Sequence, residues 1–279
     1  MPLYKIINLK EQVRDKMKLN ILYTSPCVIF YLSEMFSQED LQKCFDNFPL
    51  EKKLYKCDQN GKFRIENDSR EMVKILSKFN VWQRTIACLS SPKILKFMAE
   101  LERAEGRIEG NYAWESLNPL RNLINKYFRK KTLVKLSMEF SLLSHNSSLV
   151  PHTDSRNKLV TMMLYFPEPA QENRKHLGTT FHDFPDDKKA NYENFSNQHY
   201  TESVYPDFYS DHQAFFQTSF STGKAYGFLK NSHSWHSVSA IKLKKGEHRR
   251  SLNVNIYKMN QSCVSPLWTA FKRKVKQYV

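Results

Sequence analysis

The chain has 279 residues, of which 41% are hydrophobic, so it is long enough to bury a sizeable core in one domain or in one core with an extension. Its formal charge of +15, from 43 Lys and Arg against 28 Asp and Glu, favours acidic partners such as nucleic acid, phosphorylated glycans or an anionic membrane. The sequence contains no RNP, zinc-finger or helix-turn-helix pattern, so we do not expect specific nucleic-acid binding.

The cysteine pattern and the N-terminal residues indicate the cellular compartment in which the protein works. The five cysteines are scattered and include no CxxC pair that could clamp zinc or form a redox couple, which favours a reducing, cytoplasmic setting. The first twenty residues carry interspersed charges and lack the apolar stretch of a signal peptide. The longest apolar stretch, near residues 21–32, is interrupted by Thr24, Ser25 and Pro26, so we expect no membrane span.

Helical patterns dominate the first half of the chain. Ser37 is a suitable N-cap for residues 38–48, and apolar residues recur at helical spacing in residues 70–79, 93–104 and 115–131. We therefore expect residues 1–131 to form a largely helical support region.

The pattern changes at about Thr132. β-branched and aromatic runs occupy residues 133–143, 158–166, 224–230 and 250–257, and Pro, Gly, Asn and Asp separate them. No long helix interrupts these strands, which favours antiparallel packing. The expected fold is mainly β with α: a double-stranded β-helix, or jelly roll, over residues 132–279, buttressed by the N-terminal helices in one compact unit.

Two segments of the second half lie outside this strand pattern. Residues 184–222 are polar and rich in Tyr and Phe, and long irregular segments of this kind are often functional, so we expect a lid-like insertion. Residues 268–279 are basic and amphipathic, and we favour a solvated terminal helix there over membrane attachment.

His152 and Asp154 stand two residues apart in the sequence LVPHTDSRNKLV. Side chains at i and i+2 of an extended strand project from the same face, so both can reach one ion. A neutral imidazole and a carboxylate suit a divalent first-row metal, and a third ligand has to come from elsewhere in the fold. Taken alone, the pair is better explained by a surface histidine that is hydrogen-bonded to a turn aspartate.

Four short segments resemble one enzyme family in their order and spacing. They are PHTD at 151–154, HLGTTF at 176–181, SWHSV at 234–238 and RRSLNV at 249–254, and together they cover about the last 130 residues. In these the chain resembles the Fe(II)- and 2-oxoglutarate-dependent oxygenases, in particular the prolyl-4-hydroxylase-like branch.

The resemblance implies a metal site and a reaction. It implies that His152, Asp154 and His236 hold Fe(II), with His233 as the alternative third ligand, and that these three are the catalytic centre. Such a triad leaves positions on the metal for 2-oxoglutarate and dioxygen. The implied reaction is hydroxylation of an unactivated C–H bond, with release of succinate and CO2.

The distal carboxylate of 2-oxoglutarate needs a fixed cation, and an arginine fork matches a carboxylate with two parallel hydrogen bonds. Arg249 and Arg250 compete for this role. On a strand, Arg249 shares its face with Ser251, Asn253 and Asn255, whereas Arg250 shares its face with apolar residues. The polar row suits a pocket, and the family's Arg-x-Ser arrangement points the same way, so we expect Arg249, Ser251 and Asn255 to line the co-substrate site.

The same parity argument applies to residues 158–166. Thr161, Met163 and Tyr165 share one face, and Tyr165 falls where the prolyl-4-hydroxylase-like branch supplies a phenol to the co-substrate. We therefore expect Thr161 and Tyr165 in the co-substrate site, with a plain core aromatic as the alternative for Tyr165.

The sequence does not identify the substrate. We expect a small-molecule or peptidyl substrate, with acidic character favoured by the positive charge of the chain. Two alternatives stay open: a nucleic-acid hydroxylase or demethylase of the same fold, and a catalytically silent metal-binding scaffold.

Overall fold

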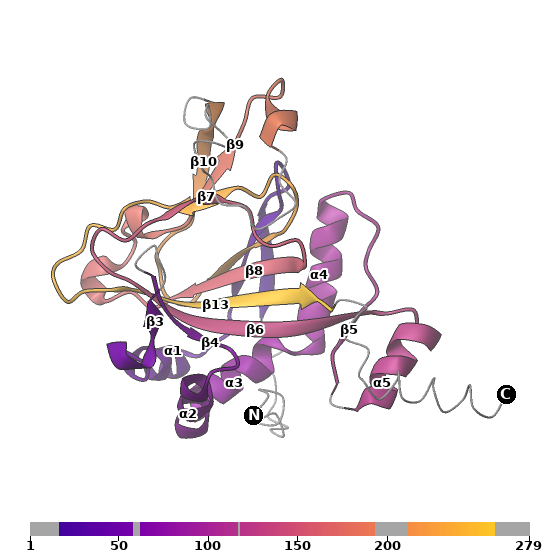
Figure 1. Cartoon of the computed structure of the whole chain (residues 1–279), viewed down its shortest axis with the longest axis horizontal. Coiled ribbons are helices and arrows are strands. Elements are labelled where there is room, and N and C mark those ends of the chain that lie inside the picture. Colours follow the sequence, from indigo (N-terminus) through magenta and orange to yellow (C-terminus); the bar gives the residue numbers. More distant parts are fainter. Residues whose placement is uncertain (1–16, 58–61, 117, 193–210, 260–279) are drawn as a thin grey trace.

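The computed structural model describes residues 17–57, 62–116, 118–192 and 211–259, and two facing β-sheets form its centre (Figure 1). From residue 132 onward the strands alternate between the sheets. The larger sheet contains β11, β8, β13 and β6 as neighbours in that order, and the smaller sheet has the order β10-β9-β12-β7. The strands concerned are β6 (Thr132–Leu143), β7 (Leu149–His152), β8 (Lys158–Tyr165), β9 (Thr180–Asp183), β10 (Gln213–Gln217), β11 (Ala225–Leu229), β12 (His236–Val238) and β13 (Arg249–Lys258).

The pairing of these eight strands defines the fold. Neighbours within each sheet are antiparallel, and consecutive strands cross between the sheets except at the β9–β10 hairpin. This arrangement is the double-stranded β-helix, or jelly roll, which the strand pattern predicted.

Strands from the first half of the chain widen the larger sheet at both edges. β2 pairs with β11 and carries β1, while β4 pairs with β6 and carries β3. The sequence analysis did not predict these strands, because runs of six residues or fewer are too short for periodicity to reveal them. The larger sheet therefore continues across the boundary at residue 131. The added strands are β1 (Lys18–Tyr23), β2 (Ile29–Ser33), β3 (Lys56–Cys57), β4 (Lys62–Glu66) and β5 (Tyr112–Trp114).

Helices cover the face of the larger sheet that points away from the smaller one (Figure 1). Ser37 caps the first of them as predicted, since its Oγ accepts a hydrogen bond from the Asp40 amide at 3.0 Å. The indole of Trp82 packs on Phe140 of β6 with ring centroids 4.8 Å apart, which anchors the helical layer to the sheet. None of the described helices is long and apolar enough to cross a membrane. They are α1 (Gln38–Asp46), α2 (Arg70–Lys78), α3 (Asn80–Leu89), α4 (Pro92–Ala104) and α5 (Pro119–Leu123), and a π-helical segment (Ile124–Phe128) continues α5.

The two faces of β13 differ as the sequence parity predicted. Leu252, Val254 and Ile256 are completely buried in the core under the helices. The alternate residues, from Arg249 onward, face the smaller sheet. The space between the two sheets is consequently polar along this strand.

The expected lid over residues 184–222 needs a correction. Residues 213–217 form β10, which pairs with β9 as an edge strand of the smaller sheet, so this part belongs to the jelly roll. The pattern QAFFQ is too short to be recognised as a strand in the sequence. Residues 193–210 of the expected lid and residues 268–279 of the expected terminal helix lie outside the described residues.

Candidate metal and co-substrate site

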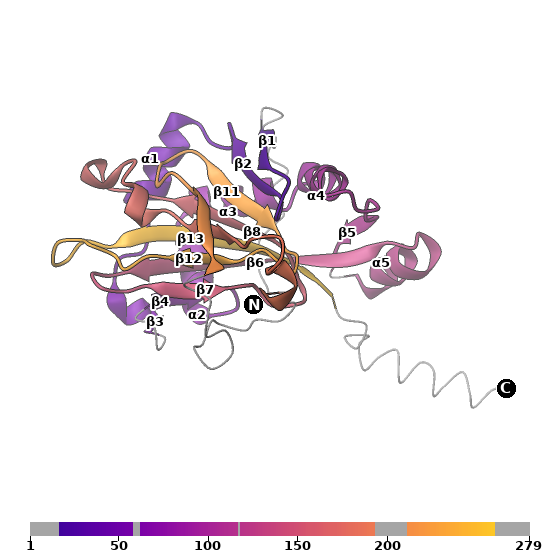
Figure 2. The same cartoon turned by 90° about the horizontal axis from the view of Figure 1, so that it is seen from above.

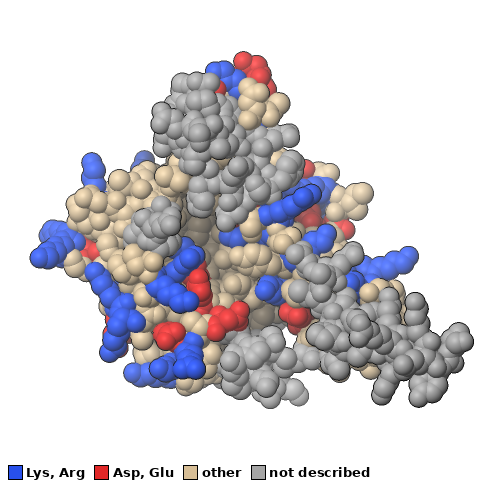
Figure 3. Space-filling model, in the orientation of Figure 1, with Lys and Arg blue, Asp and Glu red and all other residues tan. Residues whose placement is uncertain are grey.

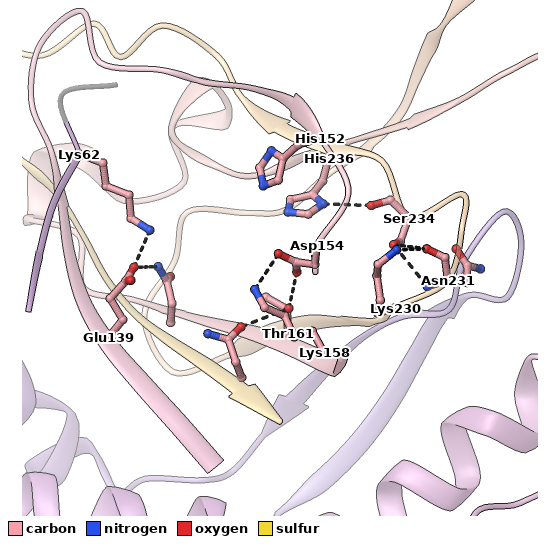
Figure 4. Close-up of polar contacts among 12 residues, drawn as sticks. Lys62, Glu139, His152, Asp154, Lys158, Thr161, Lys230, Asn231, Ser234 and His236 are labelled. Carbon is pink, nitrogen blue, oxygen red and sulfur yellow. Dashed lines mark hydrogen bonds and ion pairs between the residues drawn. The ribbon is translucent and has the colours of Figure 1, made fainter. Parts of the chain in front are cut away.

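Three predicted residues meet between the sheets. His152 ends β7, His236 begins β12, and the two are direct partners in the antiparallel pairing of these strands. Their ring centroids lie 4.3 Å apart, with Asp154 below them (Figure 4). One donor atom from each of the three residues lies within 4.8 Å of the others. This is the ligand set and the spacing that a divalent metal requires.

Backbone carbonyls orient both histidine rings. The Nδ1 of His152 lies 2.8 Å from the Val150 carbonyl oxygen. The Nδ1 of His236 lies 3.0 Å from the Ser234 carbonyl oxygen (Figure 4). A carbonyl only accepts, so each Nδ1 carries the proton and each Nε2 carries the lone pair. Burial also lowers the pKa of His236, which favours the neutral imidazole that binds metals.

Asp154 is buried and held from two sides. Its Oδ1 accepts from the Lys158 ammonium at 2.6 Å, and its Oδ2 accepts from the Thr161 hydroxyl at 2.6 Å (Figure 4). Burial by itself would raise the pKa of the Asp154 carboxyl, but the positive charge and hydrogen bond of Lys158, with electrostatic contributions from His236 and His152, outweigh burial and hold that pKa well below its usual range. Asp154 is therefore a carboxylate before any metal binds.

Thr161 and Asn255 lie at this metal end of the site. The Thr161 hydroxyl is 3.2 Å from the Asn255 amide oxygen. Thr161 has a single hydroxyl proton, and the shorter contact, to Asp154, takes it. The contact with Asn255 is therefore best satisfied when the Asn255 amide nitrogen faces Thr161 and donates to its hydroxyl oxygen. The sequence analysis expected both residues to contact the co-substrate, and the structure gives them a different contact: they support the Asp154 carboxylate.

Arg249 lies at the other end of the same strand face, six residues or about 20 Å along β13 from Asn255. Its side chain is buried, with Nε donating to the Leu177 carbonyl at 2.5 Å and Nη2 3.5 Å from the Thr179 hydroxyl. No described carboxylate lies within ion-pair distance of it. Burial lowers the pKa of Arg249, because removing the charged guanidinium from water is unfavourable and its hydrogen-bond partners are neutral.

Two further predicted residues lie beside Arg249. The guanidinium stacks over the Tyr165 ring at 4.9 Å, and the Tyr165 hydroxyl bonds to the hydroxyls of Thr179 at 2.9 Å and Thr218 at 3.0 Å. Tyr165 thus supports Arg249 with its ring in this structure. Ser251, the pairing partner of Tyr165, is completely buried, and its Oγ has no hydrogen-bond partner among the described residues.

These observations test whether a metal and a small dicarboxylate fit the residues present. The triad offers two lone pairs and a carboxylate. The other end offers a buried cation and a buried hydroxyl that have no acid partner and no hydrogen-bond partner, respectively, among the described residues. Buried polar groups are satisfied in stable proteins, so Arg249 and Ser251 indicate a ligand of opposite polarity. The chemistry of this donor set suits an iron ion and a small dicarboxylate such as 2-oxoglutarate.

The alternative residues, Arg250 and His233, lie elsewhere in the structure. Arg250 points to the helical side, where it pairs with Glu168 and stacks over Phe45 at 5.0 Å. His233 is not part of the group formed by His152, Asp154 and His236, whose donor atoms are close enough to share a metal ion.

Sequence reasoning missed several residues of the site. Lys158 approaches Asp154 because a turn, closed by the Lys158 amide on the Ser155 carbonyl at 3.0 Å, folds the chain back. Glu139 of β6 accepts from Lys62 at 2.5 Å and from Asn253 at 3.1 Å, and Figure 4 shows this pair to one side of the triad. The i,i+4 spacing of Asp154 and Lys158 is a signal for the first pair; no sequence signal joins Lys62 to Glu139.

On the outside, the surface is hollowed beneath the smaller sheet, and basic and acidic side chains both stand at the lower edge of this recess (Figure 3). The Lys and Arg residues of this face are spread around it and form no single patch (Figure 3). The mixed charge does not select a nucleic-acid substrate.

Comparisons with known proteins complete the description. No family model matches the chain, and no curated protein matches it. Among solved structures, the nonheme alpha-ketoglutarate-dependent epimerase SnoN from nogalamycin biosynthesis is 10% identical, covers 82% of this chain and 78% of its own, and has a TM-score of 0.44. A Pseudomonas putida prolyl-4-hydroxylase is 12% identical over 84% of this chain and 95% of its own, with a TM-score of 0.35.

A third solved structure contains bound ligands. HygX from Streptomyces hygroscopicus, with nickel and 2-oxoglutarate bound, is 10% identical over 83% of either chain, with a TM-score of 0.41. At this level of identity and structural agreement we base the functional proposal on the residues of this chain alone.

Proposed function

We propose that this chain is a non-haem Fe(II) oxygenase that uses 2-oxoglutarate as co-substrate and hydroxylates an unactivated C–H bond. The observation that carries the proposal is the presence, inside one jelly roll, of the His152, Asp154 and His236 group together with Arg249, a buried cation without a described acid partner. The order HxD, distal histidine, arginine in the sequence supports the prolyl-4-hydroxylase-like branch.

Each residue has a task in this proposal. His152 and His236 present their Nε2 lone pairs to the metal, since their Nδ1 protons are engaged by carbonyls. Asp154 supplies the carboxylate, which Lys158 and Thr161 hold in one orientation and keep ionised. Arg249 binds the distal carboxylate of 2-oxoglutarate, and Ser251 donates its hydroxyl proton to the same small molecule.

When bound, iron and 2-oxoglutarate supply the oxidising chemistry, in which dioxygen converts the co-substrate to succinate and CO2 and hydroxylates the substrate. The protein orients the reactants and keeps water away from them. The core around Tyr165, Phe220 and Leu243 closes the Arg249 end of the site, so we expect the substrate to enter from the opposite, polar side near Glu139.

The compartment is part of the proposal. The buried cysteines Cys27 and Cys44 are free thiols, which supports a reducing, cytoplasmic setting.

The experiment that tests the function measures succinate released from 2-oxoglutarate in the presence of Fe(II) and air, against a panel of peptidyl and small-molecule candidates. We expect succinate and hydroxylated product in equal amounts with the true substrate, and none with His236→Ala. Tight metal binding without succinate from any candidate would favour the silent scaffold.

A further inference from the structure

A cluster of apolar side chains is exposed on α5 and its π-helical continuation. Leu120 is 63% exposed, Tyr127 is 52% exposed and Phe128 is 84% exposed, with Ile124 between them at 36%. Single exposed apolar residues are ordinary, but four large ones on ten consecutive helical residues are not.

An ordinary surface helix packs its apolar stripe against the core, whereas this helix exposes its large apolar residues. The four apolar residues recur at intervals of three and four, so they lie on one side. The polar residues face the body instead: Asn125 is buried, and the Asn122 amide donates to the Ser116 carbonyl at 2.7 Å and accepts from the Ser116 amide at 2.8 Å. The protein's own described residues thus satisfy the polar side and leave the apolar side outward.

The charge around this helix has one sign. Residues 116–138 contain no Asp or Glu, and Lys or Arg occupies six of these positions. None of the basic residues on the helix or directly after it forms an ion pair with another described residue. They are Arg121, Lys126, Arg129, Lys130 and Lys131.

The helix projects at one end of the molecule, beside β5 and the start of β6, in both perpendicular views (Figures 1 and 2). The last described residue lies there too, since the Met259 amide donates to the Leu133 carbonyl at 3.0 Å. Residues 260–279, which follow, contain four Lys or Arg, no Asp or Glu, and three aromatic residues. The charge of these residues therefore has the same sign as the charge around α5.

We propose that α5 and its π-helical continuation dock on an anionic lipid surface. Leu120, Ile124, Tyr127 and Phe128 enter the boundary between headgroups and acyl chains, and the basic residues contact lipid phosphates. Single-stranded nucleic acid also attracts aromatic and basic residues, but it binds them through stacking, for which the aliphatic Leu120 and Ile124 have no face. The aliphatic members of the cluster therefore favour lipid.

Co-sedimentation of the full chain with vesicles tests this proposal. We expect binding to vesicles of phosphatidylserine and phosphatidylcholine, little binding to phosphatidylcholine alone, and weaker binding as salt is raised, because salt screens the charge. The double variant Leu120→Ser/Phe128→Ser should bind anionic vesicles at least about tenfold more weakly, and Arg129→Glu/Lys130→Glu should do the same.

Ile108 supplies a matched control, since it is 95% exposed and lies outside this helix. Ile108→Ser should bind vesicles like the wild type. All variants alter exposed side chains, so an unchanged melting temperature identifies folded protein. Vesicle binding that the helix variants leave intact, equal binding to neutral vesicles, or helix-dependent binding to labelled poly-uridine RNA in place of vesicles would each overturn the proposal.

Discussion

Arg249 and Arg250 are adjacent in the sequence but lie on opposite faces of the larger sheet. The Arg249 guanidinium stacks over Tyr165 at 4.9 Å between the two sheets, and the Arg250 guanidinium stacks over Phe45 at 5.0 Å on the helical side. Glu168 neutralises Arg250, whereas no described carboxylate neutralises Arg249. One arginine is thus available for a ligand and the other is part of the architecture.

The first prediction separates the two arginines by binding. A charge-assisted contact in a dry pocket contributes about 2 to 4 kcal/mol when its removal leaves the partner charge unpaired, so Arg249→Ala should weaken 2-oxoglutarate binding roughly 30-fold to several hundred-fold. Arg249→Lys should recover part of the loss, because the charge returns without the fork. Titration calorimetry of the metal-loaded variants under nitrogen measures this directly.

Arg250→Ala is the matched control. It should change 2-oxoglutarate binding no more than a few-fold and instead lower the free energy of unfolding by about 1 to 3 kcal/mol, because it removes the Glu168 ion pair and the contact with Phe45. A larger binding defect in Arg250→Ala than in Arg249→Ala would contradict the assignment.

This contrast shows what the sequence could reveal. The alternation of polar and apolar residues along β13 predicted which arginine faces inward, because strand parity has a period of two that ten residues display clearly. The triad could be predicted from the HxD pair and the family-like context of His236. The partners that orient these residues could not, because Leu177, Thr179 and Thr218 reach Arg249 and Tyr165 only through the packing of the two sheets. β2 and β4 escaped prediction because each has only five residues.

A second prediction concerns the metal ligands. His152→Ala and His236→Ala should each abolish measurable Fe(II) binding in anaerobic titrations, because two ligands hold a divalent ion far less tightly than three. His233→Ala, which changes a histidine outside the described ligand group, should bind Fe(II) like the wild type. Wild-type affinity in both His152→Ala and His236→Ala would remove the metal site.

Thr161 tests whether support of Asp154 matters for metal affinity. Thr161→Val keeps the shape of the side chain and removes the hydroxyl that donates to Asp154, so Fe(II) affinity should fall about 10-fold, the lower end of the range for a lost supporting contact. Thr85→Val, which removes a buried hydroxyl from α3, should leave Fe(II) affinity unchanged. Equal affinities in the two variants would mean that Lys158 alone orients the carboxylate.

A pH prediction follows from His182, which is buried with its Nε2 2.8 Å from the Ser237 hydroxyl. Burial, with smaller contributions from His212 and His236, lowers the pKa of His182 from 6.5 to about 3. Between these values the unfolded chain binds a proton that the folded protein excludes, so the contribution of His182 to stability is complete above pH 6.5 and is lost as the pH falls toward 3.

The corresponding measurement is urea unfolding of metal-free protein at pH 7.5 and pH 5.5. His182 should account for a loss of about 1.4 kcal/mol in the free energy of unfolding between these pH values. His182→Gln, which cannot titrate, should lose that much less than the wild type over the same interval. An identical pH dependence in the two proteins would contradict the prediction, because it would show that His182 binds a proton equally well in the folded and unfolded states.

The most direct test of the central claim is a calorimetric titration of 2-oxoglutarate into the wild-type chain under nitrogen, with Fe(II) and after its removal by a chelator. The triad and Arg249 form the two ends of one site, so we predict binding of one 2-oxoglutarate per chain with Fe(II), and binding weakened at least about tenfold without the metal. Binding of equal strength in both conditions, or no binding in either, would contradict the account.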